Sequence, residues 1–264
     1  MESRNPVFAR SEEFQRGGYA TFDTRTPGSA ELEEMYGAPS ATPVQTGRMT
    51  IDDVVMRTAS IFGVLLLTAA VSYVLEVPFP VVIGAALAGF VIAMVITFKK
   101  TISPPLILVY GAIEGVFVGG ISAAYETFYD GIVVQAVLGT LGAFGSMLAL
   151  YRVGAVRATP RFQRILLISA VGYLVFGLMH LVGVQFKWWD SIYAGGGMLA
   201  IAVSAFGVVL ASLFLVLDFD QIEQGIRNGA PQQYAWLAAF GLVVTLVWLY
   251  LEILRLLAVL RGDN

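Results

Sequence analysis

The chain of 264 residues contains no cysteine and only one histidine. Without cysteine it can form neither a disulfide bond nor a thiolate metal site, and it has no cysteine nucleophile. One histidine and no H-E-x-x-H motif leave nothing typical of a zinc site. These absences exclude a cysteine-dependent site and leave nothing typical of a zinc enzyme, and we expect a protein that is not an enzyme and carries no cofactor.

Charged residues are also scarce, at 13% of the chain, whereas hydrophobic residues make up 57%. A soluble globular protein has roughly 25% charged residues. This composition predicts an integral membrane protein whose main partner is the lipid bilayer. Nucleic acid is not expected as a partner.

Residues 1–49 have a different composition, rich in Ser, Thr, Gly, Pro and Glu and without an apolar period. They are predicted to form a polar, mostly disordered cytoplasmic tail. The scattered aromatic residues, such as Phe8 and Tyr36, leave open a docking role. The spacing Thr50-Ile51-Asp52-Asp53 is that of a capping box, so the helical membrane domain is predicted to span residues 50–264.

Seven apolar runs follow the tail, and each is long enough to cross a bilayer, for which about 20 residues suffice. They predict an all-α integral membrane protein with seven transmembrane helices. The expected spans are 57–76, 79–98, 104–125, 131–151, 163–186, 192–217 and 234–260.

Basic residues indicate the orientation of these spans, because they concentrate on the cytoplasmic side of membrane proteins. If the N-terminus is inside, the outer loops and flanks hold only Lys187 and Arg261. The inner ones hold Arg48, Lys99, Lys100, Arg152, Arg157, Arg161, Arg164 and Arg227. We therefore expect a cytoplasmic N-terminus and, after seven spans, an external C-terminus.

Small residues suggest how the helices pack. Gly111, Gly115 and Gly119 recur every four residues in the third span and form a double G-x-x-x-G ridge. Such a ridge lets two backbones approach closely inside a membrane. We expect this face to pack against another helix.

Three acids, Asp218, Asp220 and Glu223, end the sixth apolar run. Asp218 and Asp220 are two residues apart, so a helix directs them to roughly opposite sides. Glu223 and Arg227 have the spacing of an i,i+4 ion pair, which predicts a solvated face for Asp220 and Glu223. Asp218 is therefore the better candidate for a functional site.

Ionisable residues inside the spans are further candidates, because a charge in a membrane is costly. Glu252 lies in the last run, close to Arg255, and Glu114 lies near the middle of the third. His180 lies in the fifth, where a hydrogen-bonded packing role is the more typical one. The candidates for residues along an ion pathway are therefore Glu114, Asp220 and His180.

These residues carry a resemblance to a known family. Leu217-Asp218-Phe219-Asp220-Gln221-Ile222 resembles the penultimate-helix motif of the Bax inhibitor-1 (transmembrane BAX inhibitor motif) family. Leu249-Tyr250-Leu251-Glu252-Ile253-Leu254 is similar to its last-helix motif, in which the acid is usually Asp. Glu114-Gly115 and the seven runs also fit, and the N-terminal segment resembles a bacterial, YccA-like branch.

The resemblance implies a fold in which six helices wrap a central seventh. It implies a pH-sensitive calcium leak of the bacterial plasma (inner) membrane, with Ca²⁺ and H⁺ as partners. Asp218 and Glu252 would form the pH sensor and gate, share a proton and bind Ca²⁺ transiently. The family's basic latch residue would correspond to Lys99 or Lys100.

The separation of Asp218 and Glu252 along the sequence argues against a direct contact between them. If the last helix starts near Tyr234, Glu252 lies about 27 Å along it, at about 1.5 Å per residue. A simple antiparallel hairpin would then place Asp218 and Glu252 near opposite faces of the membrane. Glu114 is the next partner to consider for either acid.

Two other functions remain open. Glu114, Asp218 and Glu252 are compatible with a proton-coupled transporter, although the sequence has no internal repeat of the transporter kind. The polar tail favours a non-enzymatic regulator that contacts a membrane protease or a stress-response protein. A retinal protein is excluded, because the last span contains no lysine for a Schiff base.

Overall fold

The structure is a computed structural model, and it describes residue 28 and residues 46–193 and 197–262. The predicted disorder of the tail concerns residues 1–49, of which only 28 and 46–49 are described. The chain divides into two compact units, Met1–Thr42 and Pro43–Asn264. All the described helices lie in the second unit.

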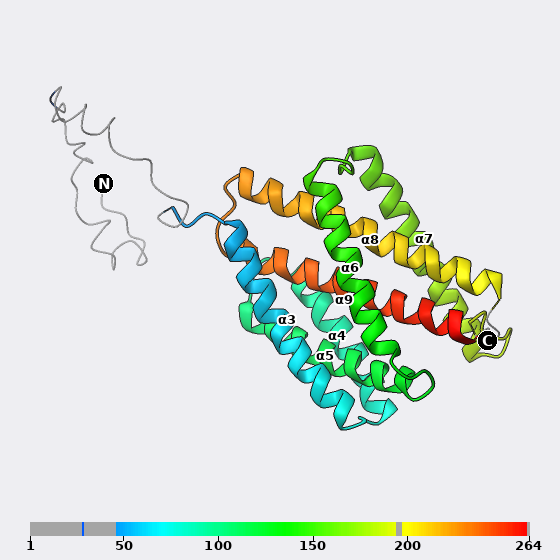
Figure 1. Cartoon of the computed structure of the whole chain (residues 1–264). Helices are drawn as coiled ribbons and strands as arrows, with labels where there is room; N and C mark the ends of the chain where they lie inside the picture. The colour runs from blue at the N-terminus through cyan, green and yellow to red at the C-terminus, as the bar shows by residue number, and fades with distance from the viewer. Residues whose placement is uncertain (1–27, 29–45, 194–196, 263–264) are drawn as a thin grey trace, which may run out of the picture. The chain divides into compact units, whose positions relative to one another are not determined.

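The described part of this unit is helical, and seven helices are long and apolar enough to cross a membrane. The predicted all-α, multi-pass membrane fold is therefore confirmed. The helices are α3 (Ile51–Val74), α4 (Phe79–Phe98), α5 (Pro104–Glu126), α6 (Ile132–Arg152), α7 (Pro160–Gln185), α8 (Met198–Arg227) and α9 (Tyr234–Gly262) (Figure 1).

The clearest differences from the predicted spans lie at two helix ends. Helix α3 begins at Ile51 rather than at residue 57, and α8 continues to Arg227 rather than ending at 217. In both places polar residues extend the helix beyond the apolar run. Hydropathy marks where a helix leaves the apolar layer, and the backbone hydrogen bonds continue past that point.

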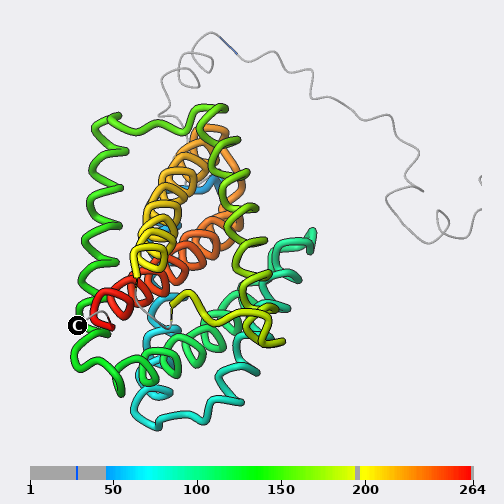
Figure 2. The backbone as a smooth tube through the Cα atoms, turned by 90° about the vertical axis from the view of Figure 1, so that its right-hand side faces the viewer, coloured from blue at the N-terminus to red at the C-terminus, as the bar shows by residue number. Residues whose placement is uncertain are grey.

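Helix α9 is the centre of the unit. Its backbone approaches α3, α5, α6 and α8, and Figure 2 shows it running beside α8. In its most apolar stretch 61% of the residues are buried, compared with 6% in α7. The backbone of α4 approaches only α5, and that of α7 only α8, so the outer faces of α4 and α7 remain for lipid.

The start of α3 is fixed by the predicted capping box. Thr50 Oγ1 accepts a hydrogen bond from the Asp53 amide over 3.1 Å, and Asp53 Oδ2 accepts one from the Thr50 amide over 3.1 Å. Asp53 Oδ1 also pairs with Arg57 one turn later, at 2.7 Å. The Arg57 guanidinium lies over the ring of Trp236, 5.7 Å from its centroid, and so links α3 to α9.

The residues just before α3 bind the turn between α8 and α9. The Met49 amide donates to the Ala230 carbonyl, and the Gln232 amide donates to the Gly47 carbonyl, both over 2.8 Å. The Met49 side chain is buried, and its Cε would lie 2.7 Å from a Cβ placed on Gly225. These contacts, which we call the strap, attach the chain at residues 47–49 to the α8–α9 hairpin.

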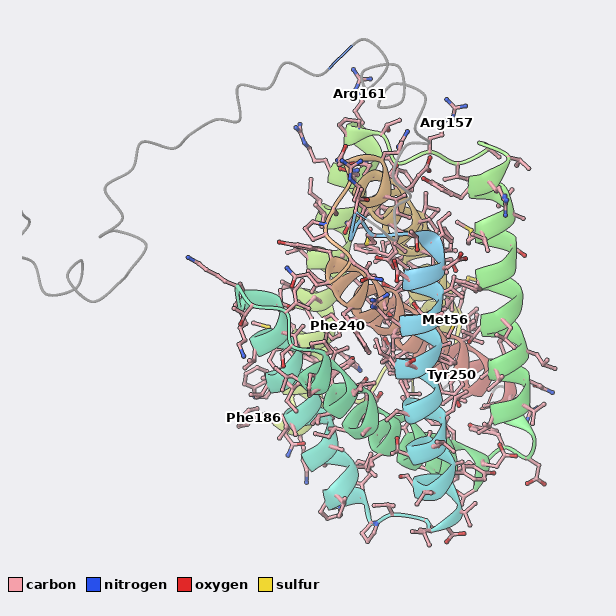
Figure 3. The ribbon with its side chains drawn as sticks, turned by 90° about the vertical axis from the view of Figure 1, so that its left-hand side faces the viewer. Met56, Arg157, Arg161, Phe186, Phe240 and Tyr250 are labelled. Carbon is pink, nitrogen blue, oxygen red and sulfur yellow. The ribbon has the colours of Figure 1, made fainter. Side chains whose placement is uncertain are left out.

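Two of the basic residues expected on the inner side lie at one end of the unit. Figure 3 shows Arg157 and Arg161, which precede or begin α7, at the end of the unit where α3 also begins. If successive helices cross the membrane in alternating directions, the segment before α3 and the α6–α7 connection lie on the same side of it. The arrangement is consistent with the predicted grouping of inner loops.

The glycine ridge of α5 packs against α3, as its spacing predicts. A Cβ on Gly115 would overlap the backbone carbonyl of Leu65, and one on Gly119 would overlap that of Ala69. The two backbones are therefore closer than any other residue type would allow. This contact fixes α3 and α5 as a pair, against which α9 packs.

We predict that Gly119→Ala destabilises the protein, because the added methyl group meets backbone atoms that cannot move aside. The expected loss is about 1–3 kcal/mol, as for overpacked cores. It can be measured as a lower midpoint of thermal unfolding in detergent micelles. Gly142→Ala on α6 is the control, because a Cβ there has nothing within 4 Å. Equal midpoints for the two variants would contradict the close α3–α5 contact.

Candidate functional site

Glu252 is a buried acid in α9, with 3% of its surface exposed. Its Oε2 accepts hydrogen bonds from the Tyr173 hydroxyl at 2.8 Å and from Arg255 Nη1 at 2.9 Å. Its Oε1 accepts one from Trp248 Nε1 at 3.1 Å. The carboxylate thus has a charged partner and two neutral donors, as a buried charge requires.

Helices α7, α8 and α9 meet at this acid because α8 carries a glycine there. A Cβ on Gly207 would overlap the Glu252 carboxyl and lie 2.5 Å from the Tyr173 hydroxyl. Glycine therefore leaves room for a hydrogen bond that runs from α7 to α9 across the face of α8. Tyr173 is the residue through which α7 reaches the central helix.

Arg255 extends this group toward the connection between α7 and α8. Its guanidinium lies over the Tyr193 ring, 5.3 Å from the centroid. The His180 ring lies edge-on to the same tyrosine, with centroids 5.4 Å apart, and its Nε2 is 3.5 Å from Ser191 Oγ. His180 therefore packs against this connection, and Tyr193 separates it from the Arg255–Glu252 pair.

Asp218 lies on α8 with its carboxyl half-buried against α9. The Thr245 hydroxyl on α9 interacts with this carboxyl. The same hydroxyl donates to the Gly241 carbonyl over 3.2 Å, and its one proton can serve only one acceptor at a time. Oδ2 of Asp218 is buried and has no hydrogen-bond partner among the residues that the structure describes.

The structure does not bring Asp218 and Glu252 together. No hydrogen bond or ion pair in the described ranges joins them. In the antiparallel α8–α9 pair, Glu252 lies against Gly207 and Asp218 against Thr245. Thr245 and Glu252 are two helical turns apart on α9, about 10 Å along its axis. The side chain opposite Asp218 is thus the Thr245 hydroxyl and not a second carboxyl group.

The other acids of α8 lie at its solvated end, as their spacing predicts. Gln224 Nε2 donates to Asp220 Oδ2 over 2.5 Å. Glu223 accepts from the Tyr151 hydroxyl over 2.5 Å and lies 3.8 Å from Arg227, the expected i,i+4 pair. Asp220 and Asp218 therefore face different surroundings.

Glu114 faces α4 rather than α8 or α9. A Cβ on Gly89 of α4 would lie 2.8 Å from its Oε2, and its carboxyl interacts with the Tyr110 hydroxyl one turn earlier. The neighbouring Gly115 packs on α3. The structure thus brings Glu114 into contact with neither Asp218 nor Glu252.

The comparison with protein families identifies the chain. A family model described as Bax inhibitor 1 like matches residues 5–262. The chain belongs to the Bax inhibitor 1 like family. A search of the curated proteins found no match.

Membership of the Bax inhibitor 1 like family makes the chain a membrane protein of that type. The resemblance also implies a basic latch residue and a transient Ca²⁺ site. Lys99 and Lys100 follow the end of α4, are exposed, and take part in no ion pair within the described residues. In the described ranges, no group of three or more His, Cys, Asp or Glu residues could hold a metal ion. In this family member the expected latch and the transient Ca²⁺ site therefore remain predictions.

The sequence placed Arg255 close to Glu252 without predicting their ion pair, and it pointed to none of the other partners of the two acids. Arg255 stands one helical turn after Glu252, so its spacing alone could have predicted the ion pair. Tyr173, Gly207 and Thr245 give no such signal, because an aromatic residue, a glycine and a threonine are common inside membrane helices. Their contacts depend on how α7, α8 and α9 are rotated against one another.

We predict that Arg255→Gln destabilises the protein by roughly 3 kcal/mol, because it leaves the Glu252 carboxylate buried without a counter-charge. Arg255→Gln combined with Glu252→Gln should restore much of this loss. Thermal unfolding of the single and double variants in detergent measures the coupling between the two sites.

The exposed pair of α8 supplies the matched control. Glu223 and Arg227 have exposed side chains and lie 3.8 Å apart. Their coupling in the same double-variant cycle should be below about 0.5 kcal/mol, as for exposed helix pairs. Similar coupling energies for the two pairs would contradict the structural role of the buried one.

Proposed function

We propose that the chain is a pH-sensitive calcium leak of a bacterial plasma membrane, and not an enzyme. Asp218 is the residue that responds to protons. Membership of the Bax inhibitor 1 like family supports a membrane function of this kind. The observation that carries the proposal is the buried Oδ2 of Asp218, which lies against the central helix without a hydrogen-bond partner.

The protonation state of Asp218 affects the contact between α8 and α9. A charged oxygen that has no donor is costly inside a protein, whereas a protonated carboxyl can donate to a nearby oxygen. A proton or a cation at Asp218 therefore changes the free energy of this contact. Because α9 touches α3, α5, α6 and α8, a shift there acts on most of the unit.

The surroundings of Asp218 suit the weak binding that ion passage requires. Calcium prefers oxygen ligands, and the Asp218 carboxylate, the Thr245 hydroxyl and the Gly241 carbonyl are oxygens of this kind. So few ligands hold a cation loosely enough for it to leave again. Glu252 is already held by Arg255, so in this proposal it serves packing instead.

In the orientation that the basic residues favour, Asp218 lies in the cytoplasmic half of the protein and Glu252 in the outer half. The leak would then respond mainly to cytoplasmic pH. The Glu252 group would hold α7, α8 and α9 together while the contact at Asp218 changes.

A second candidate function rests on the strap. The strap joins residues 47–49 to the α8–α9 turn, so the segment before α3 is connected to the hairpin that carries Asp218. This arrangement favours a regulator that acts through protein contact. Deletion of residues 1–45 separates the two functions: a regulator loses its partner, whereas a leak keeps its calcium flux.

We predict that Asp218→Asn removes the pH dependence of calcium flux in proteoliposomes between about pH 6 and about pH 8, because asparagine cannot lose a proton. Asp220→Asn is the matched control: it removes an acid of the same helix whose carboxyl binds Gln224 instead. It should leave the pH profile unchanged. A wild-type protein without calcium flux, or an unchanged profile in Asp218→Asn, would disprove the leak.

Thr245→Asp tests the role of the residue opposite Asp218. It places a second carboxyl beside the first, and two close carboxyls share a proton over a wider pH range than one does. We expect the pH at half-maximal flux to rise by about one unit or more, and the transition to broaden. An unchanged profile would show that Asp218 and Thr245 do not face each other at the gate.

Proton-driven uptake of calcium against its gradient would instead indicate a coupled transporter.

A further inference from the structure

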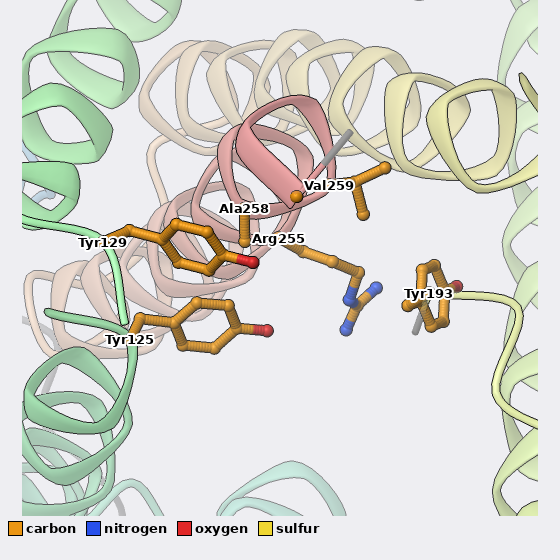
Figure 4. Close-up of a pocket in the computed structure, with 7 residues that line it drawn as sticks. Tyr125, Tyr129, Tyr193, Arg255, Ala258 and Val259 are labelled. Carbon is orange, nitrogen blue, oxygen red and sulfur yellow. The ribbon is translucent and has the colours of Figure 1, made fainter. Parts of the chain in front are cut away.

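A cavity lies beside the last turns of α9, and Arg255, the partner of Glu252, forms part of its wall. Its volume is 220 Å³. Figure 4 shows it between the end of α5, the connection from α7 to α8, and α9. Its lining is formed by Tyr125, Tyr129, Tyr193, Arg255, Ala258, Val259 and Gly262.

The polar groups of this cavity are hydrogen-bond donors. Figure 4 shows the hydroxyls of Tyr125 and Tyr129 pointing toward the Arg255 guanidinium, with Tyr193 on its other side. Neither of the first two hydroxyls makes a hydrogen bond within the part of the chain that the structure describes. Arg255 uses Nη1 for Glu252 and Tyr173, and a third of its side-chain surface, 34%, remains exposed.

The charge around the cavity is suited to an anion. No Asp or Glu side chain lines it, and the Glu252 carboxylate behind Arg255 is paired with that guanidinium. A second arginine, Arg261, lies on the next turns of α9 and donates to the Asp130 carbonyl over 2.8 Å. A cation would meet arginine here, whereas an anion would meet arginine and unpaired phenol donors.

We propose that this cavity binds a phosphoryl group, supplied either by a lipid headgroup or by free phosphate. The planar guanidinium matches the oxygens of a phosphate, and the two phenols add donors from α5. Trp188 and Trp189, which stand a few residues before Tyr193 in the same connection, are exposed, as aromatic residues are where a helix leaves the membrane. The cavity thus lies at a level where headgroups and solutes both reach it.

A bound phosphoryl group would join α5, α9 and the α7–α8 connection through one ligand. It would therefore stabilise the folded protein by its binding free energy. This proposal does not depend on calcium leakage or on Asp218, because its residues lie at the C-terminal end of α9 and its neighbours, whereas Asp218 faces Thr245 near the middle of α9. Its test can use unfolding alone.

The experiment uses the full chain in maltoside micelles, which contain no phosphate. Inorganic phosphate, phosphatidylglycerol, or a galactosyl diacylglycerol with the same acyl chains is added at matched ionic strength. We expect phosphate, phosphatidylglycerol or both to raise the unfolding midpoint by about 3 °C or more, and the galactosyl lipid to leave it unchanged. A response to phosphatidylglycerol alone assigns the site to a lipid headgroup, and a response to phosphate alone assigns it to a soluble phosphate.

The double variant Tyr125→Phe with Tyr129→Phe should lose most of the shift, since it removes two donors and keeps both rings. Tyr234→Phe is the control, because Tyr234 begins α9 and lies far from the cavity. The proposal is overturned if no phosphoryl compound stabilises the wild type, or if the galactosyl lipid does so equally well. It is also overturned if the double variant responds as the wild type does.

Discussion

The packing of α7 and α8 against α9 depends on one carboxylate inside the membrane domain. Glu252 is 3% exposed, and lipid offers it neither water nor counter-charge. Arg255 supplies the charge from the same helix, while Tyr173 and Trp248 supply neutral donors. Because Tyr173 belongs to α7, the need to satisfy one acid of α9 also determines how an otherwise peripheral helix is attached.

The same requirement explains why the two acids of the motifs differ in character. Glu252 is fully paired and therefore fixed, whereas Asp218 has one buried oxygen without a donor. A paired charge resists change, and an unpaired one is sensitive to a proton or a cation. We therefore propose that Glu252 stabilises the fold and that Asp218 responds to a proton or a cation, although both motifs resemble those of one family.

The central helix connects these two sites with the strap. At its N-terminal end α9 follows a turn that is bound by residues 47–49, and Trp236 on its first turns lies under Arg57 of α3. Asp218 lies against its middle, and the Glu252 group and the tyrosine cavity lie toward its C-terminal end. A movement of α9 would thus affect all five of these contacts.

The sequence by itself determined the features that depend on local spacing. Hydropathy predicted seven spans, the residues from Thr50 to Asp53 predicted the cap, and glycines four residues apart predicted a face of the third span that packs closely on another helix. Spacing also separated Asp218 from Asp220 and predicted the pair of Glu223 with Arg227. In each case the interacting residues lie on one helix face within a few turns, where helical geometry alone decides what meets.

Only the tertiary structure decided which side chains of different helices meet. The register of α8 against α9 places Thr245, and not Glu252, opposite Asp218, and it places Gly207 where Tyr173 can cross to Glu252. Rotation and axial shift of one helix against another arise from the packing of whole faces. A residue pattern along one helix contains neither quantity, so the partner of each acid could not be read from the sequence.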